Sequence, residues 1–306
     1  RFKNILVGVD LSQGERIVSA ELPPPTAEAV ERALWLAKMN SARVTFFYAL
    51  DISPAAQRTI EASGKGEDSV VAEAKDVLNR LVTRAAADGI AAGMDVRFGK
   101  SWRQMIERVF QDGHDLVVAG TRHLGALKSF LVGSTGMKLL RKCPCPVWIT
   151  QPQPESHIKS ILVAHCLRTV GDIAMELGCS MAQLHGAELH VLHSLEFPEL
   201  DTALPARISA EKAAESRLNA EQHIESQLSN YQFTHPPQVH IVTDPPDFAV
   251  LEEVQQHHIE LAVMGTIART GIRGLITGNT AEKLLPRIPC SVLAVKPPGF
   301  SSPVSI

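Results

Sequence analysis

Short apolar runs alternate along the chain with longer segments of helical periodicity. Residues 2–9 and 116–119 are nearly continuous apolar runs, which is typical of parallel strands buried on both faces. Residues 27–40 instead repeat alanine, valine and leucine at intervals of three and four, which predicts an amphipathic helix. Strands that alternate with helices predict an α/β fold, with a parallel sheet covered on both faces.

The first half is predicted to contain five strands and four helices. We expect strands at residues 2–9, 43–50, 94–98, 116–119 and 147–150, and helices at residues 27–40, 67–88, 101–111 and from Gly133 to just before Cys143. Residues 13–25 end in three prolines and are expected to form a loop, with Thr26 as the N-cap of the first helix.

The same order restarts after a proline-containing linker at residues 151–156, so we predict two domains, residues 1–151 and 157–297. The predicted strands include residues 159–164, 188–193 and 238–242, and the predicted helices are residues 169–184, 209–230 and 248–257.

The two halves share matched residues at a single offset of 145 positions, which indicates an internal duplication. The matched pairs are Gly120 and Gly265, Gly133 and Gly278, Thr135 and Thr280, Lys138 and Lys283, and Cys145 and Cys290.

The offset differs at the first strand, where Ile5 aligns with Ile161 at 156 positions. The first half therefore carries eleven extra residues before its second strand, most simply in the loop at residues 13–25. That loop is expected at the carboxyl ends of the strands, where ligands bind to doubly wound sheets. It could form a lid over a site, or it could be a surface insertion, which long loops tolerate well.

Composition limits the classes of partner. The chain has 306 residues, a net charge of −3, 45% hydrophobic and 5% aromatic residues, and no basic run, so we expect a globular protein that does not bind nucleic acid. No apolar segment reaches ~18 residues, which predicts no membrane span. Five cysteines without framework spacing and no leader sequence favour a reducing, cytoplasmic location.

A candidate anion site follows the fourth strand. Gly120 and Thr121 end that strand, and Gly133, Ser134 and Thr135 begin the next helix. The start of a helix offers free backbone N–H groups and a favourable dipole to an anion. A tight strand-to-helix turn that binds nothing is the simpler alternative. The segment is not a P-loop, because no Gly-Lys-Ser/Thr closes it.

Metal and catalytic chemistry are less well supported. Cys143-Pro-Cys145 is best explained as packing before the fifth strand. Zinc could bind the set His185, His190 and His193, or His165 with Cys166, but their spacing is not diagnostic, so we predict no metal site and no catalytic residue.

On these motifs the chain resembles two tandem universal stress protein domains, most like the E type. The residues that carry the resemblance are the segment 7–10, Gly120-Thr121 with Gly133-Ser134-Thr135, the segment 139–147, and Gly265-Thr266 with Gly278-Asn279-Thr280. The resemblance implies two five-stranded, parallel-sheet α/β sandwiches related by a pseudo-two-fold axis, Rossmann-like and similar to adenine nucleotide alpha-hydrolases. It also implies that ATP or AMP binds, with or without Mg²⁺.

The resemblance assigns binding residues in both halves. In the first half they are Asp10 toward the adenosine end, Ala49 through its main chain, and Gly120, Thr121, Arg122, His123, Gly125, Gly133, Ser134 and Thr135 around the phosphates. In the second half they are Gly265, Thr266, Gly278, Asn279 and Thr280.

Departures from the family pattern favour the first half. Nucleotide-binding members carry Gly-x2-Gly-x9-Gly-Ser/Thr, and the inner glycine is replaced by His123 in the first half and Ala268 in the second. Cys166 stands where the first half has Asp10, and Asn279 replaces the serine. The resemblance therefore implies nucleotide binding chiefly in the first half.

Three functions stay open. The leading hypothesis is a cytoplasmic stress-response protein that uses nucleotide occupancy as a sensor. The others are a non-nucleotide or partner-binding module with degenerate sites, and a slow ATP hydrolase, for which we identify no general base. The fifth strands could pair with each other to form an intramolecular pseudo-dimer, and a homodimer is also possible.

Overall fold

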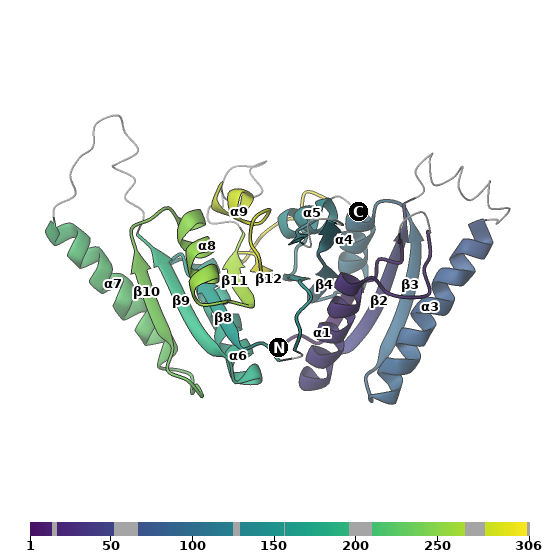
Figure 1. Ribbon diagram of the computed structural model, residues 1–306, viewed down its shortest axis with the longest axis horizontal. Helices are drawn as coiled ribbons and strands as arrows, with labels where there is room; N and C mark the ends of the chain where they lie inside the picture. Colours follow the sequence, from purple (N-terminus) through teal and green to yellow (C-terminus); the bar gives the residue numbers. More distant parts are fainter. Residues whose placement is uncertain are drawn as a thin grey trace. The chain divides into compact units, whose positions relative to one another are not determined.

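The protein consists of two compact units (Figure 1). A computed structural model describes residues 1–13, 17–51, 67–124, 129–155, 157–195, 210–266 and 279–304, and of residues 67–68, 122–124, 129–131 and 279–280 it describes the backbone alone. Unit 1 comprises Arg1–Ser156 with Ser301–Ile306, and unit 2 comprises His157–Phe300. Each unit is an α/β sandwich, as the sequence predicts.

Unit 1 contains a five-stranded parallel sheet in the order β3-β2-β1-β4-β7. The strands are β1 (Asn4–Gly8), β2 (Arg43–Leu50), β3 (Ala92–Phe98), β4 (Leu116–Gly120) and β7 (Val147–Thr150). The helices are α1 (Pro24–Asn40), α3 (Glu67–Ala87), α4 (Ser101–Asp112) and α5 (Ser134–Lys142). α1 and α3 pack on the sheet from one side, and α4 and α5, which contact each other, pack from the other, as right-handed crossovers require.

Unit 2 repeats this arrangement with a parallel sheet in the order β10-β9-β8-β11-β12. The strands are β8 (Ser160–Ala164), β9 (Glu188–Ser194), β10 (Gln238–Val242), β11 (Leu261–Gly265) and β12 (Ser291–Val295). The helices are α6 (Thr169–His185), α7 (Ala210–Leu228), α8 (Pro246–Gln256) and α9 (Asn279–Leu284). Helices α8 and α9 contact each other, as α4 and α5 do in unit 1.

Apolar residues of the central strands form the core of each unit. In β4, Leu116, Val117 and Val118 are fully buried, and in β11 the same is true of Leu261 and Val263. Burial of both strand faces explains why these segments are apolar runs with no alternation. In the part of the chain that the structure describes, no helix combines the length and apolar character that a membrane crossing requires.

Strand registers confirm the duplication residue by residue. Ile5 pairs with Val44 between β1 and β2, and Ile161 pairs with Leu189 between β8 and β9. Ile5 and Ile161, on the first strands of the two units, are 156 positions apart. Val44 and Leu189, on the second strands, are 145 positions apart. The offset therefore changes between the first and the second strand.

The eleven extra residues lie in one loop. Residues 9–23 connect β1 to α1, fifteen residues in all, whereas residues 165–168 connect β8 to α6 with only four. Helices α1 and α6 both have 17 residues. The insertion therefore lies wholly between the first strand and the first helix of unit 1.

Two helix starts differ from the sequence prediction for the same reason. Helix α1 begins at Pro24 with Pro23 as its N-cap, so the prediction of Thr26 as N-cap is wrong. Helix α8 begins at Pro246 with Pro245 as its N-cap, two residues before the predicted start. Proline fits the first turn of a helix, because its missing N–H would have no partner there.

The loop after β4 contains a short hairpin that the sequence did not predict. Strand β5 (Arg122–Leu124) pairs in antiparallel fashion with β6 (Ser129–Leu131), separately from the main sheet.

Candidate functional site

The predicted nucleotide residues of unit 1 lie along the carboxyl edge of its sheet. Asp10 follows β1, Ala49 is near the end of β2, and Gly120 ends β4. In the register, Gly8 is beside Ala119, so β1 and β4 end at the same level. The fold therefore brings these segments to one edge, where doubly wound sheets bind ligands.

Asp10 is exposed and closes a tight turn. Its Oδ1 atom accepts hydrogen bonds from the backbone N–H of Ser12 at 3.0 Å and from the Ser12 hydroxyl at 2.5 Å. Its backbone carbonyl accepts a bond from the Thr26 hydroxyl at 3.3 Å. Both side-chain bonds go to one carboxylate oxygen, so the turn fixes the carboxylate at the strand end and keeps it accessible to solvent.

The described part of the inserted loop is attached to unit 1. The Tyr48 hydroxyl donates to the Ile17 carbonyl at 2.8 Å, and the Arg80 guanidinium donates to the Ala20 carbonyl at 3.3 Å. Leu11 is fully buried. Burial, followed by the nearby Asp10 carboxylate, raises the pKa of Tyr48, so its hydroxyl remains a donor. These contacts hold the loop against β2 and α3, with Asp10 still exposed.

Helix α5 presents an uncapped amino terminus. Its N-cap, Gly133, is extended (φ −68°, ψ 173°), and no side chain among the described residues caps the helix. Ser134 is exposed, and Gly133 and Thr135 are half-buried. The first turn contains no acidic residue, whereas Arg141 and Lys142 occupy the last turn. The free N–H groups and the helix dipole therefore favour an anion at this end.

Thr121, which directly follows β4, supplies a buried hydroxyl at the carboxyl end of that strand. It is 7% exposed, and its N–H donates to the Thr150 carbonyl at 3.0 Å. Its Oγ1 atom has no hydrogen-bond partner among the described residues. Buried hydroxyls are nearly always paired, so this one is suited to a ligand or a water molecule.

Close packing also accounts for the glycine at each fourth-strand end. A Cβ atom on Gly120 would lie 2.4 Å from the Pro25 carbonyl oxygen at the start of α1. A Cβ atom on Gly265 would lie 2.7 Å from a Val170 methyl at the start of α6. Both glycines thus let the start of a helix pack closely against the end of a strand. The sequence analysis assigned these glycines to ligand contact and did not predict this packing role.

The corresponding edge of unit 2 differs chemically. The Lys296 ammonium, which is buried, donates to the Thr266 hydroxyl, the counterpart of Thr121. Helix α9 has only six residues and carries Glu282 in its first turn. Cys166 stands at the position of Asp10, and burial raises the pKa of its thiol. Of these features, Glu282 disfavours an anion at the start of α9, whereas the hydrogen bond from Lys296 engages the Thr266 hydroxyl that would otherwise face a ligand.

Some predicted site residues cannot be placed. Gly125 and Gly278 lie outside the described residues, and the structure describes Arg122, His123, Asn279 and Thr280 by their backbone alone.

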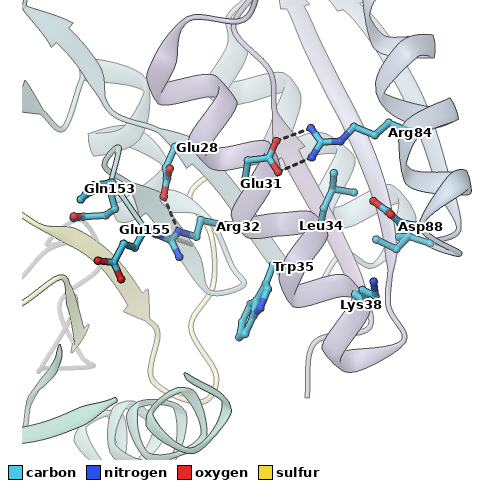
Figure 2. Close-up of a pocket in the computed structure, with 12 residues that line it drawn as sticks. Glu28, Glu31, Arg32, Leu34, Trp35, Lys38, Arg84, Asp88, Gln153 and Glu155 are labelled. Carbon is cyan, nitrogen blue, oxygen red and sulfur yellow. Dashed lines mark hydrogen bonds and ion pairs between the residues drawn. The ribbon is translucent and has the colours of Figure 1, made fainter. Parts of the chain in front are cut away.

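A pocket of 380 Å³ in unit 1 lies elsewhere, along α1 and α3 (Figure 2). The Arg84 guanidinium makes two bonds of 2.5 and 2.6 Å to the Glu31 carboxylate at its wall, and Arg32 bonds Glu28 at 2.6 Å. Two ion pairs, Arg84 with Glu31 and Arg32 with Glu28, thus lie in its wall, and the pocket contains none of the predicted nucleotide residues. The sequence analysis did not identify it, because it combines two helices with the linker at Gln153–Glu155.

Among the described residues, histidines of unit 2 form two groups with carboxylates. One contains His190, His240 and His257 with Glu253, and the other contains His165 and His223 with Asp172. Neither is one of the two combinations weighed from the sequence, His185 with His190 and His193, or His165 with Cys166. His185 accepts from the Ile158 N–H, and His193 bonds the His165 carbonyl at 2.8 Å.

Burial lowers the pKa of three imidazoles in these groups, two of them buried and His240 half-buried, below the ordinary value. Burial, more than the neighbouring histidines, lowers the pKa of His190 to about 4, and burial also lowers the pKa of His240. Burial lowers the pKa of His165 to about 4, against the opposing effect of Asp172. Each ring therefore keeps a nitrogen lone pair near pH 7.

Comparison with known proteins supports the two-unit organisation. Residues 1–151 and 157–296 each match the sequence profile of the universal stress protein family. Over 319 residues the chain is 23% identical to Universal stress protein E of Photorhabdus laumondii, which covers 99% of this chain and 98% of that protein. It is 27% identical to Universal stress protein E of Escherichia coli K12 over 239 residues, 70% of this chain and 72% of the other.

Solved structures share the tandem fold. A functionally unknown protein, PA1789 of Pseudomonas aeruginosa PAO1, matches with a TM-score of 0.71 and 21% identity, covering 97% of this chain and 93% of that one. A universal stress protein from Archaeoglobus fulgidus matches with a TM-score of 0.66 and 20% identity, covering 96% and 98%.

Proposed function

Because the chain belongs to the universal stress protein family, we propose that unit 1 binds an adenine nucleotide, ATP or AMP, at the carboxyl edge of its sheet. The observation that carries this proposal is the amino terminus of α5, which is exposed, uncapped and free of acidic residues. Phosphate oxygens would accept bonds from its first N–H groups and from the Ser134 hydroxyl, and the Thr121 hydroxyl lies buried at the end of the neighbouring strand.

Asp10 suits the ribose end of the same ligand. Its Oδ1 atom already holds the Ser12 turn, so Oδ2 is the oxygen that would accept a ribose hydroxyl. Because the inserted loop continues from this turn, nucleotide occupancy would be transmitted to residues 11–23. Such coupling would make the protein a nucleotide sensor in a stress response.

Unit 2 is assigned no nucleotide in this proposal. The Lys296 ammonium already donates a hydrogen bond to the Thr266 hydroxyl, and Glu282 would repel a phosphate at the start of α9. Glycines are kept at the strand ends of both units, and the packing of Gly265 against Val170 explains this without a ligand.

Isothermal titration calorimetry of nucleotide-stripped, full-length protein tests the proposal. ATP or AMP should release heat with one site per chain. Gly133→Val should abolish this binding by placing a branched side chain at the helix start, whereas Gly278→Val, the matched change in unit 2, should leave it intact. Absence of heat from either nucleotide would contradict the proposal, and so would loss of binding in Gly278→Val alone.

A non-nucleotide or partner-binding module is the second candidate. The hydrogen bonds that hold the inserted loop to Tyr48 and Arg80 favour it, because an anchored loop forms a fixed surface in the absence of any ligand. Slow ATP hydrolysis is a third candidate, and it predicts steady phosphate release that Asp10→Ala abolishes.

A further inference from the structure

Four side chains with metal-binding atoms converge on one face of the unit 2 sheet. His190 lies on β9 and His240 on β10, and the register places Gln238 beside His190, so the two histidines are diagonal neighbours that point to the same face. Glu253 lies on α8, and His257 is its C-cap residue, four positions later and on the same side of the helix. Helix α8 packs against β9, so Glu253 and His257 lie beside the two histidines of the strands.

The polar atoms of the four side chains lie close to one another. His190 Nδ1 lies 3.2 Å from His240 Nε2, and Glu253 carboxylate oxygens lie 3.4 Å from His240 Nδ1 and 3.3 Å from His257 Nε2. One ligand atom from each of the four residues can be chosen so that all lie within 4.8 Å of one another. A tetrahedral zinc site with bonds of about 2.1 Å has ligand atoms about 3.4 Å apart.

Two buried atoms of the group lack hydrogen-bond partners. His190 is 1% exposed, and its Nε2 atom has no partner among the described residues. The Oε2 atom of Glu253 is also buried, and although it lies 3.3 Å from His257 Nε2, it has no hydrogen bond among the described residues. Native proteins rarely leave such atoms unpaired, and a bound cation would satisfy both.

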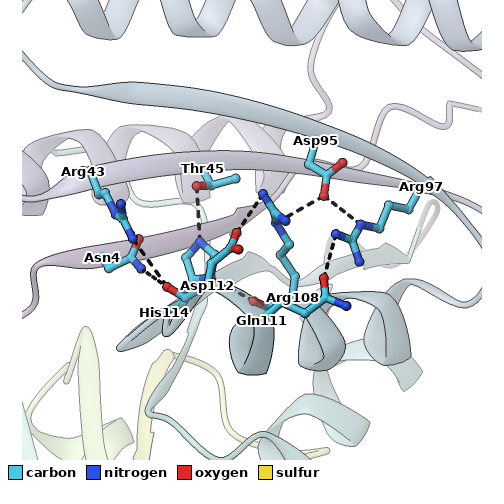
Figure 3. Close-up of polar contacts among 9 residues, drawn as sticks. All are labelled: Asn4, Arg43, Thr45, Asp95, Arg97, Arg108, Gln111, Asp112 and His114. Atoms are coloured by element: carbon cyan, nitrogen blue, oxygen red, sulfur yellow. Dashed lines mark hydrogen bonds and ion pairs between the residues drawn. The ribbon is translucent and has the colours of Figure 1, made fainter. Parts of the chain in front are cut away.

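The matched positions of unit 1 hold an ion-pair network centred on an arginine (Figure 3). Thr45, Asp95, Arg108 and Asp112 correspond, at the offset of 145, to His190, His240, Glu253 and His257. There the Arg108 guanidinium lies 3.2 Å from the Asp95 carboxylate and 2.7 Å from that of Asp112, so opposite formal charges neutralise each other.

Unit 2 replaces that ion-pair network with residues of another kind. All four substituents are imidazoles or a carboxylate, and the fixed positive charge of arginine is gone. A single negative group, Glu253, then stands among three imidazoles, two of which, His240 and His257, are partly exposed at 21% and 31% of their side-chain surface. A hydrated ion could therefore reach the group from solvent.

We propose that His190, His240, Glu253 and His257 bind one divalent transition-metal ion, for which Zn²⁺ has the most suitable ligand preference. Three imidazole nitrogens and one carboxylate oxygen form a donor set that zinc accepts in tetrahedral geometry. With no thiolate in the set, cobalt(II) should occupy the same site and report its geometry. The site is separate from the nucleotide edge of unit 1 and does not depend on it.

Metal titration of the full-length chain tests this proposal. Tag-free protein treated with EDTA and dialysed should bind one equivalent of Zn²⁺, measured by calorimetry, and Co²⁺ should give the visible absorption of a tetrahedral complex. Glu253→Gln and His257→Gln should each weaken Zn²⁺ binding by at least about 100-fold, since even second-shell changes cost ten- to hundredfold. His257 is partly exposed, so its substitution is compatible with folding, which circular dichroism checks.

Two controls separate this site from adventitious binding. His235→Gln removes an exposed histidine of the same unit, and Asp112→Asn changes the matched position of unit 1. Neither should alter the affinity for Zn²⁺. The proposal is overturned if no Zn²⁺ binds, or if binding survives both Glu253→Gln and His257→Gln. Binding that is lost in His223→Gln and kept in Glu253→Gln would place the ion at the other histidine group and also overturn it.

Discussion

Glycines at the ends of β4 and β11 have packing roles that sequence motifs alone do not reveal. Gly120 belongs to a motif associated with phosphate binding, yet the Pro25 carbonyl lies where its side chain would be. The sequence shows that glycine occupies this position in both halves. It cannot show that a helix start, rather than a ligand, makes the approach, because the contact joins residues 95 positions apart.

We expect Gly120→Ala to destabilise unit 1 by about 1–3 kcal/mol, because a methyl group cannot fit beside rigid backbone without displacing α1. Denaturant unfolding followed by tryptophan fluorescence measures this, since all three tryptophans, Trp35, Trp102 and Trp148, lie in unit 1. Gly93→Ala in β3 is the matched control, because nothing lies within 4 Å of its added Cβ. Equal effects of the two changes would refute the packing explanation.

At the scale of elements, local patterns predicted most strands and helices, and proline was the main source of error. The starts of α1 and α8 were placed late because prolines were interpreted as loop residues. The hairpin β5–β6 was not predicted, because strands of three residues have no measurable periodicity. The eleven-residue insertion, in contrast, was located correctly from the change of offset alone.

The polar group that joins α4 to the sheet gives stability a pH dependence (Figure 3). His114 is 4% exposed, and its ring bonds the Arg108 carbonyl at 3.3 Å and the Thr45 hydroxyl at 3.2 Å. Burial lowers its pKa below the ordinary value of 6.5. In the unfolded chain His114 is protonated below pH 6.5, while in the folded protein it stays neutral to lower pH. The unfolded state then binds more protons, so stability falls as the pH drops below 6.5.

We therefore expect the free energy of unfolding of unit 1 to decrease between pH 7 and pH 5, and His114→Gln to reduce this slope. Glutamine keeps a donor and an acceptor but does not titrate in this range. Urea unfolding followed by tryptophan fluorescence at several pH values measures both slopes. An unchanged slope in His114→Gln would show that other groups cause the dependence.

The histidine group of unit 2 shows where sequence analysis stopped short. Its members at positions 190, 240, 253 and 257 lie on two strands and one helix, so no local spacing connects them. The duplication offered a signal that could have found them: each falls at the offset of 145 from a polar residue of unit 1, and every one of those residues has changed its chemistry.

For the whole molecule, duplication followed by divergence explains how one fold carries two different sites. Both units keep the parallel sheet, the strand registers and the close-packed glycines. Unit 1 combines Asp10 with an acid-free helix start, whereas unit 2 has Glu282 at the matched helix and a histidine group near its edge strand β10. We thus expect a nucleotide to stabilise unit 1 and Zn²⁺ to stabilise unit 2.

Hydrogen–deuterium exchange of the full-length chain, with and without ATP, shows which helix start contacts the nucleotide. We expect slower exchange of the backbone amides at the start of α5, Ser134 to Met137, and no change at α9, Asn279–Leu284. Slower exchange confined to α9, or equal rates in both helices with and without ATP, would contradict nucleotide binding at unit 1.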